Sequence, residues 1–234
     1  MSIKKPKPSK NETKRDRFRR LAQRRTGMVI NRLRILGNCA DKGRYEYTKE
    51  DMERIFIAID LPPQLKEGIA GLITQWRWLP IRWLPRENWH VTLVPPMYLE
   101  DEEVRSLVLL LEGAKLGKPF PIRFSEVSLA PPGLAARMIW LEGETPPELA
   151  ATKKKLENLL IGKPHFFPVS REARPYKLHV TLARFEPGDL KELQERTRVL
   201  GNAKMSFTAD EVVLMESHLK PTGAEYEKIA TVAL

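Results

Sequence analysis

The sequence predicts an α+β fold made of two duplicated lobes. Segments of strand and helix character alternate along the chain, but several neighbouring strands have no helix between them. This order favours antiparallel pairing over a doubly wound parallel sheet. In addition, His90-Val91-Thr92-Leu93 recurs as His179-Val180-Thr181-Leu182 after about ninety residues, which is enough for one small α+β unit per copy. The composition, 42% apolar and 30% charged over 234 residues, provides for a hydrophobic core.

The excess positive charge lies in the first fifth of the chain. Residues 1–52 carry 16 Lys and Arg against 6 Asp and Glu, whereas residues 53–234 carry 24 of each. A basic arm on a neutral body indicates an anionic partner, for which RNA, DNA and anionic lipid all qualify. The alternative is an unstructured, solubilising leader. We therefore expect a basic N-terminal extension over 1–53 and one domain over 54–234.

Within the extension, the elements differ in character. Residues 1–13 are rich in lysine and proline and predict disorder. Residues 14–36 place apolar side chains at helical spacing with arginines on the opposite face, which predicts an amphipathic helix that ends at Gly37. Residues 45–53 fit either a linker or a helix that runs into the first strand.

The domain opens with an apolar strand over 54–60, closed by Leu61-Pro62-Pro63, as expected of a strand buried on both faces. The pattern then predicts helices over 63–76, 101–114, 146–160 and 189–199. Further strands are predicted over 81–84, 90–94, 120–129, 137–141, 178–184, 205–216 and 226–233.

Several classes of protein are excluded by what the sequence lacks. Cys39 is the single cysteine, so a disulfide framework and a cysteine-rich zinc site are excluded, and a reducing, cytoplasmic compartment is expected. No apolar run is long enough to span a membrane, and the basic N-terminus has no apolar stretch typical of a secretory signal. A phosphate-binding glycine loop, a nucleophile elbow and a His-Glu-x-x-His pair are all missing.

The repeated tetrapeptide predicts a site. In a strand, His90 and Thr92 share one face while Val91 and Leu93 anchor the other, and the same holds for His179 and Thr181. Two such strands side by side would place two imidazoles and two hydroxyls around one cleft. One imidazole can act as base and the other as acid, and threonine hydroxyls can donate to phosphoryl oxygens. Phosphodiester hydrolysis by two histidines, without metal, fits this set.

Other candidate residues also have structural interpretations. Arg184 is suited to a phosphoryl oxygen, but its odd offset from His179 turns it away unless the strand ends or twists there. Metal binding is disfavoured, since each strand offers one good ligand and no nearby carboxylate completes a site. His165 and His218 lack the motif's context. Tyr176, among basic residues, is our candidate for stacking on a base, whereas Phe56, Trp83, Trp89 and Phe185 are interpreted as core.

These motifs resemble the 2H phosphoesterase superfamily. Within it, the opening strand and the segment Pro221-Thr-Gly-Ala-Glu-Tyr226 are similar to the RNA 2′,3′-cyclic phosphodiesterases, also called 2′-5′ RNA ligase-like proteins. Further matches are Glu87-Asn88, Arg137-Met-Ile-Trp140, Arg174-Pro175, His179-Val-Thr-Leu-Ala-Arg184 and Glu216-Ser217. The resemblance covers residues 54–234. Val94-Pro95-Pro96 departs from the family's usual turn after the first motif, which concerns substrate preference.

The resemblance implies a bilobal fold in which two antiparallel sheets face a central cleft, with helices outside. It implies opening of 2′,3′-cyclic phosphates on RNA ends to 2′-phosphates, with no metal or nucleotide cofactor. Separately, we expect a monomer that does not bind membranes. His90 would then protonate the departing 3′ oxygen and His179 would activate water, while Thr92, Thr181 and Arg184 would hold the phosphoryl oxygens.

Two alternatives remain open at this stage. One is related chemistry in the same site, on 2′-5′ phosphodiesters or in RNA end joining. The other is a non-catalytic protein that recognises RNA ends in the cleft and gains affinity from its basic arm.

Overall fold

The computed structural model divides into two compact units, residues 1–50 and 51–234. It describes Thr13, Arg15, residues 52–131, 136–161 and 176–186, Leu193, and residues 201–221 and 223–234. Apart from Arg15, the helix predicted over 14–36 lies outside the described residues, and so does most of the helix predicted over 189–199. No helix in the described ranges combines the length and apolar character needed to cross a membrane.

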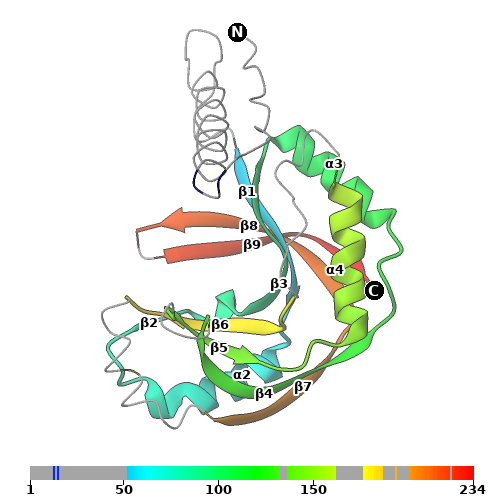
Figure 1. Cartoon of the computed structure of the whole chain (residues 1–234). Helices are drawn as coiled ribbons and strands as arrows, with labels where there is room; N and C mark the ends of the chain where they lie inside the picture. Colours follow the sequence, from blue (N-terminus) through cyan, green and yellow to red (C-terminus); the bar gives the residue numbers. More distant parts are fainter. Residues whose placement is uncertain are drawn as a thin grey trace, which may run out of the picture. The chain divides into compact units, whose positions relative to one another are not determined.

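The second unit is built on two antiparallel sheets (Figure 1). One sheet has the strand order β3-β1-β8-β9 and the other has the order β2-β6-β5-β4-β7. The predicted α+β class with antiparallel pairing is confirmed. The strands are β1 (Glu53–Asp60), β2 (Arg82–Trp83), β3 (His90–Leu99), β4 (Phe120–Ala130), β5 (Met138–Glu142), β6 (His179–Arg184), β7 (Asn202–Ala209), β8 (Glu211–Lys220) and β9 (Gly223–Ala233).

Three helices supply further apolar residues to the core: α2 (Pro63–Ile73), α3 (Asp101–Glu112) and α4 (Pro147–Leu160). Two short 3₁₀ turns, η2 (Thr74–Trp76) and η3 (Arg86–Asn88), complete the described elements. Proline opens both α2 and α4, where its fixed φ suits the first turn. At the start of α3, Glu100 and Glu103 form a reciprocal capping box.

The predicted strand over 205–216 is wrong in one respect, because it is two strands that belong to different sheets. β7 pairs with β4, and β8 pairs with β1. The chain passes from one sheet to the other at Asp210, an exposed residue between two segments of equally strong strand character. Strand propensity therefore continues through the point where the chain changes sheets.

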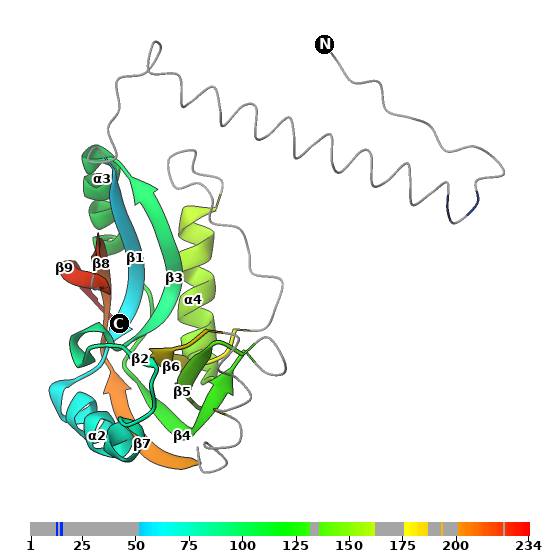
Figure 2. The ribbon, with the colours of Figure 1, turned by 90° about the vertical axis from the view of Figure 1, so that its left-hand side faces the viewer.

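The two His-Thr strands lie close together and share a core on one side (Figure 2). The apolar residues of the two motifs are at most 1% exposed: Val91, Leu93, Val180 and Leu182. They belong to one apolar cluster that includes residues from both sheets and from α2, α3 and α4. Since side chains alternate along a strand, the histidines and threonines point away from that core. The fold thus fixes both motifs firmly from behind and presents their polar faces together.

Candidate active site

The polar faces of both motifs line one cavity of about 160 Å³. His90 and Thr92 of β3 lie on its wall together with His179 and Thr181 of β6. Other lining residues include Arg54, Phe56, Asn88, Pro96, Arg184 and Tyr226. The two imidazoles, 89 positions apart in sequence, therefore meet in one place.

The two halves of the site are built alike. Reading from the histidine strand, β3-β1-β8-β9 corresponds to β6-β5-β4-β7. His90 lies opposite Asp60 at the end of β1, and His179 lies opposite Glu142 at the end of β5. Each carboxylate forms an ion pair with a lysine, Asp60 with Lys66 in the first half and Glu142 with Lys177 in the second. The internal repeat predicted from the tetrapeptide thus extends to the sheets around it.

A β-bulge explains how Arg184 reaches the cavity. Thr181 pairs with Trp140 and Ala183 pairs with Ile139, so Leu182 is an extra residue in β6. The extra residue shifts the alternation by one position. Arg184 consequently points to the same side as His179 despite its odd offset, and it lines the cavity.

The same bulge occurs in the first half. Thr92 pairs with Ala58 and Val94 pairs with Ile57, so Leu93 is the extra residue in β3. Pro95 therefore occupies the position that corresponds to Arg184. At this position the duplicated backbone carries a guanidinium in the second half only.

Hydrogen bonds set the tautomer of both histidines. Nδ1 of His90 lies 2.8 Å from the carbonyl oxygen of Asn88, and Nδ1 of His179 lies 2.9 Å from that of Lys177. A carbonyl oxygen only accepts, so each Nδ1 carries the hydrogen and proton exchange is left to Nε2. Nε2 of His90 is 3.0 Å from the Thr92 hydroxyl. Both imidazoles are thus oriented by the backbone two residues upstream.

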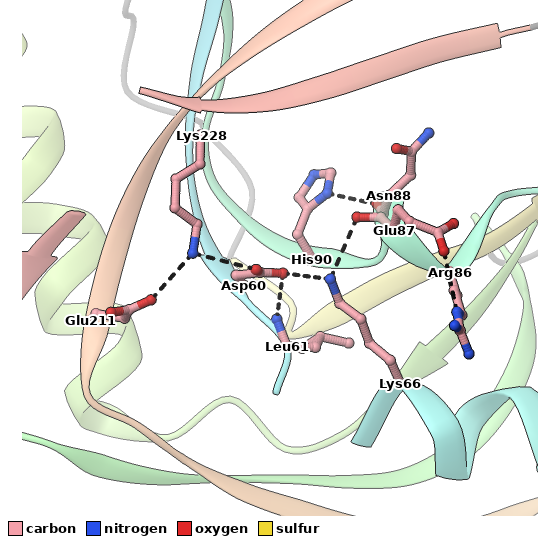
Figure 3. A network of polar contacts seen from close by, with 9 residues as sticks. All are labelled: Asp60, Leu61, Lys66, Arg86, Glu87, Asn88, His90, Glu211 and Lys228. Atoms are coloured by element: carbon pink, nitrogen blue, oxygen red, sulfur yellow. Dashed lines mark hydrogen bonds and ion pairs between the residues drawn. The ribbon is translucent and has the colours of Figure 1, made fainter. Parts of the chain in front are cut away.

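A network of ion pairs supports the turn that carries the Asn88 carbonyl (Figure 3). Lys66 is 2.8 Å from Asp60 and donates to the Glu87 carbonyl at 3.4 Å. The Asn88 amide donates to the Ala224 carbonyl at 2.6 Å. The acceptor for His90 is therefore held from α2 and from β9.

The two imidazoles lie in different surroundings. The ring of His90 is 4.8 Å from that of Phe56 and 5.3 Å from that of Tyr226, whereas His179 stacks on Trp140 at 3.9 Å. Burial lowers the pKa of His90 to about 4, more strongly than the Asn88 carbonyl and Asp60 raise it; nearby Lys66 and His179 lower it further. A pKa of about 4 keeps His90 neutral at pH 7.

Tyr176, the candidate for stacking on a base, makes contacts that the sequence does not predict. Its hydroxyl donates to the Thr92 carbonyl at 2.7 Å, Lys153 lies over its ring at 5.2 Å, and it does not line the cavity. The basic neighbours that single it out in sequence say nothing of this contact with the other lobe. Tyr176 instead ties the segment before β6 to β3.

Sequence reasoning missed Arg54 and the position of Phe56. Phe56 is buried as expected, yet its ring also forms part of the cavity wall. Arg54 enters the sequence prediction only as the first residue of a strand that resembles a family. Its alternation with Phe56 along that strand was the signal that both share one face.

One group outside the cavity has the donors of a cation site. Glu216, His218 and Glu227 bring ligand atoms within 4.8 Å of one another. His218 lies 3.3 Å from Glu216 and 3.4 Å from Glu227, so the imidazole nitrogens already contact both carboxylates. Ser217 is hydrogen-bonded to Arg54 and so lies on the cavity face of the sheet. Neighbouring residues of a strand point to opposite faces, so Glu216 and the group around it lie on the face away from the cavity.

Comparison with known proteins agrees with this architecture. The profile of the LigT-like phosphoesterases matches residues 59–140 and 141–226, one match for each motif. The sequence is 26% identical to the RNA 2′,3′-cyclic phosphodiesterase of Methanocaldococcus jannaschii over 75% of this chain and 98% of that protein. It is 25% identical to a protein of the same name from Geobacillus stearothermophilus over 76% of this chain and 56% of the relative.

Solved structures share the fold. E. coli LigT complexed with 3′-AMP superposes with a TM-score of 0.60 at 22% identity, covering 78% of this chain and 98% of LigT. The protein TT0787 of Thermus thermophilus gives a TM-score of 0.62 at 21% identity, with coverages of 77% and 97%. Because the family profile accounts for both lobes and both motifs, the chain belongs to the LigT-like phosphoesterases of the 2H superfamily.

Proposed function

We propose that this protein hydrolyses the 2′,3′-cyclic phosphate ends of RNA to 2′-phosphomonoesters by acid/base catalysis with His90 and His179. The observation that carries the proposal is the paired imidazole geometry: both Nδ1 atoms are bound to backbone carbonyls, and both rings line one cavity. Thr92, Thr181 and Arg184 line the same cavity and can donate to phosphoryl oxygens. An acid, a base and donors for an anion are thus within one small volume.

In the proposed reaction, one neutral imidazole takes a proton from water as its oxygen attacks phosphorus. The bond between phosphorus and the 3′ oxygen breaks, and the other imidazole, protonated, gives its proton to that oxygen. The product is a 2′-phosphate with a free 3′ hydroxyl. The base gains one proton and the acid loses one, so the total number of protons on the two histidines does not change.

The resemblance assigns the acid to His90 and the base to His179. An acid must be protonated before the step, whereas burial lowers the pKa of His90 to about 4. A bound phosphodiester anion favours the imidazolium and so raises this pKa. An NMR titration of the His90 ring with inorganic phosphate should move its pKa toward neutrality; a pKa that stays near 4 would reverse the two roles.

The relatives agree with this substrate class. Both curated relatives bear the name RNA 2′,3′-cyclic phosphodiesterase. E. coli LigT has been crystallised with 3′-AMP and with phosphate, ligands that carry the groups such a site would hold.

The decisive experiment is a product assay on an RNA oligonucleotide with a 2′,3′-cyclic end, with and without chelator. We expect a 2′-phosphate as the sole product at equal rates in both conditions. A joined product or cleavage of a 2′-5′ linkage would favour the related chemistries, and a chelator-sensitive rate would contradict the metal-free mechanism. Tight binding with no product would favour a protein that recognises ends without hydrolysing them.

A further inference from the structure

The cavity contains a second arginine that the proposed reaction leaves unused. Nη1 of Arg54, on β1, donates to the Ser217 hydroxyl at 2.6 Å, and Ser217 is only 4% exposed. In the described part of the chain, neither Arg54 nor Arg184 is paired with a carboxylate. A cyclic phosphate carries one negative charge, which Arg184 can meet alone. The guanidinium of Arg54 is therefore held in place by Ser217 and can bind a second anionic group.

Arg54 is displaced from the histidine end of its own sheet. Thr92 lies opposite Ala58 and His90 lies opposite Asp60, so the reacting groups adjoin the last residues of β1. Arg54 comes four residues before Ala58, which is about 13 Å along an extended strand. The side chain reaches part of this distance back, since it lines the cavity. The backbone of Arg54 is thus displaced along β1 from the residues that adjoin the two histidine-strand groups His90 and Thr92.

An exposed aromatic ring stands next to Arg54. Tyr98 of β3 is the cross-strand partner of Arg54, and the adjacent pair, Ile55 and Met97, is buried in the main core. Alternation places Arg54 and Tyr98 together on the other face of the sheet, the face of the cavity. Tyr98 is 54% exposed, so its ring is open to a partner. β3 is the edge strand of this sheet, so no other strand of the sheet lies beyond it.

We propose that Arg54 and Tyr98 form a subsite for the nucleotide that precedes the cyclic-phosphate end of the RNA. The inference rests on the proposed function. Arg54 contacts the phosphodiester that links the last two nucleotides, and Tyr98 stacks on the penultimate base. An anionic linkage and an aromatic base are the two groups that single-stranded RNA offers in this order. The preferred substrate is therefore an oligonucleotide end rather than a cyclic mononucleotide.

The test compares kcat/KM for uridine 2′,3′-cyclic phosphate with that for the dinucleotide UpU ending in a 2′,3′-cyclic phosphate. Wild type should prefer the dinucleotide. Arg54→Gln should reduce this preference roughly 10- to 100-fold through loss of a charge-assisted hydrogen bond, and Tyr98→Ala roughly 5- to 100-fold through loss of stacking. Arg54→Lys, which keeps the charge, should lie between Arg54→Gln and wild type.

Two matched controls lie on exposed positions of α3, Arg105→Gln and Leu109→Ala, and should keep the wild-type preference. Equal activity of wild type on both substrates, or a preference unchanged by both subsite variants, would overturn the subsite. If neither substrate is hydrolysed, the proposed function fails instead. Binding of the product dinucleotide, with its 2′-phosphate, then tests the subsite alone: Arg54→Gln should weaken it and flatten its salt dependence, and an unchanged affinity would again overturn the subsite.

Discussion

The two halves of the cavity share one backbone plan but differ in chemistry. In each half a histidine lies opposite a carboxylate at the end of a neighbouring strand, and a bulged leucine follows the threonine. Yet His90 is enclosed by Phe56 and Tyr226, whereas His179 stacks on Trp140. The duplicated backbone thus supplies two oriented imidazoles, and the different residues around them give the two rings the unequal surroundings that the proposed acid and base would need.

Removing either imidazole is the strongest way to break this comparison. His90→Ala and His179→Ala should each lower kcat for the cyclic phosphate by about 10²- to 10⁴-fold, the range for loss of a general acid or base. His218→Ala is the matched control, because His218 lies on the other face of the sheet. Rates are measured at pH 7, with thermal unfolding to check the fold. Wild-type activity in either cavity variant would exclude the two-histidine mechanism.

The bulges sharpen the comparison at a second level. Arg184 and Pro95 occupy equivalent positions, but only the arginine can bind a phosphoryl oxygen. Arg184→Gln should reduce kcat/KM roughly 10- to 100-fold, the value of a charge-assisted hydrogen bond. Pro95→Ala at the matched position should change it less than about threefold by the same reasoning. Equal losses in the two variants would mean that Arg184 acts through the fold and not on the substrate.

These positions also show how far sequence alone reaches. The repeated tetrapeptide predicts that the histidine and threonine of each motif share one face of a strand and that the valine and leucine share the other. This prediction is possible because the alternation of side chains along a strand is a local property. The bulge at Leu182 inverts that alternation, and it depends on pairing with β5, which the local sequence does not encode. Sequence alone therefore does not determine the direction of the Arg184 side chain or the contact of Tyr176 with Thr92. Arg54 was overlooked because its role depends on Ser217 and Tyr98, which come from other strands.

The unequal environments predict a pH effect on stability. Unfolded, His90 titrates near 6.5, and folded near 4, so the unfolded state binds more protons between these values. Stability should fall as the pH drops from about 6.5 toward 4, by about 2–3 kcal/mol at pH 4.5 from this group. Urea unfolding measured at pH 7 and at pH 4.5 should show that the free energy of unfolding decreases less in His90→Gln than in wild type. His179→Gln is the matched control. If the free energy of unfolding of His90→Gln fell between pH 7 and pH 4.5 by as much as that of wild type, His90 would not be a buried neutral group.

The smallest expected effect concerns the contact between the halves. Tyr176→Phe removes the hydroxyl that donates to the Thr92 carbonyl, so the free energy of unfolding should fall by about 1 kcal/mol. Tyr98→Phe, whose ring is exposed, should leave stability unchanged and serves as the control in the same urea titrations. Because the bond joins the segment before His179 to the strand of His90, its loss should also lower kcat a few-fold with little change in KM. A stacking role predicts a different result, with stability, kcat and KM all unchanged in Tyr176→Phe, because the ring that would hold a base is retained and only the hydroxyl is lost.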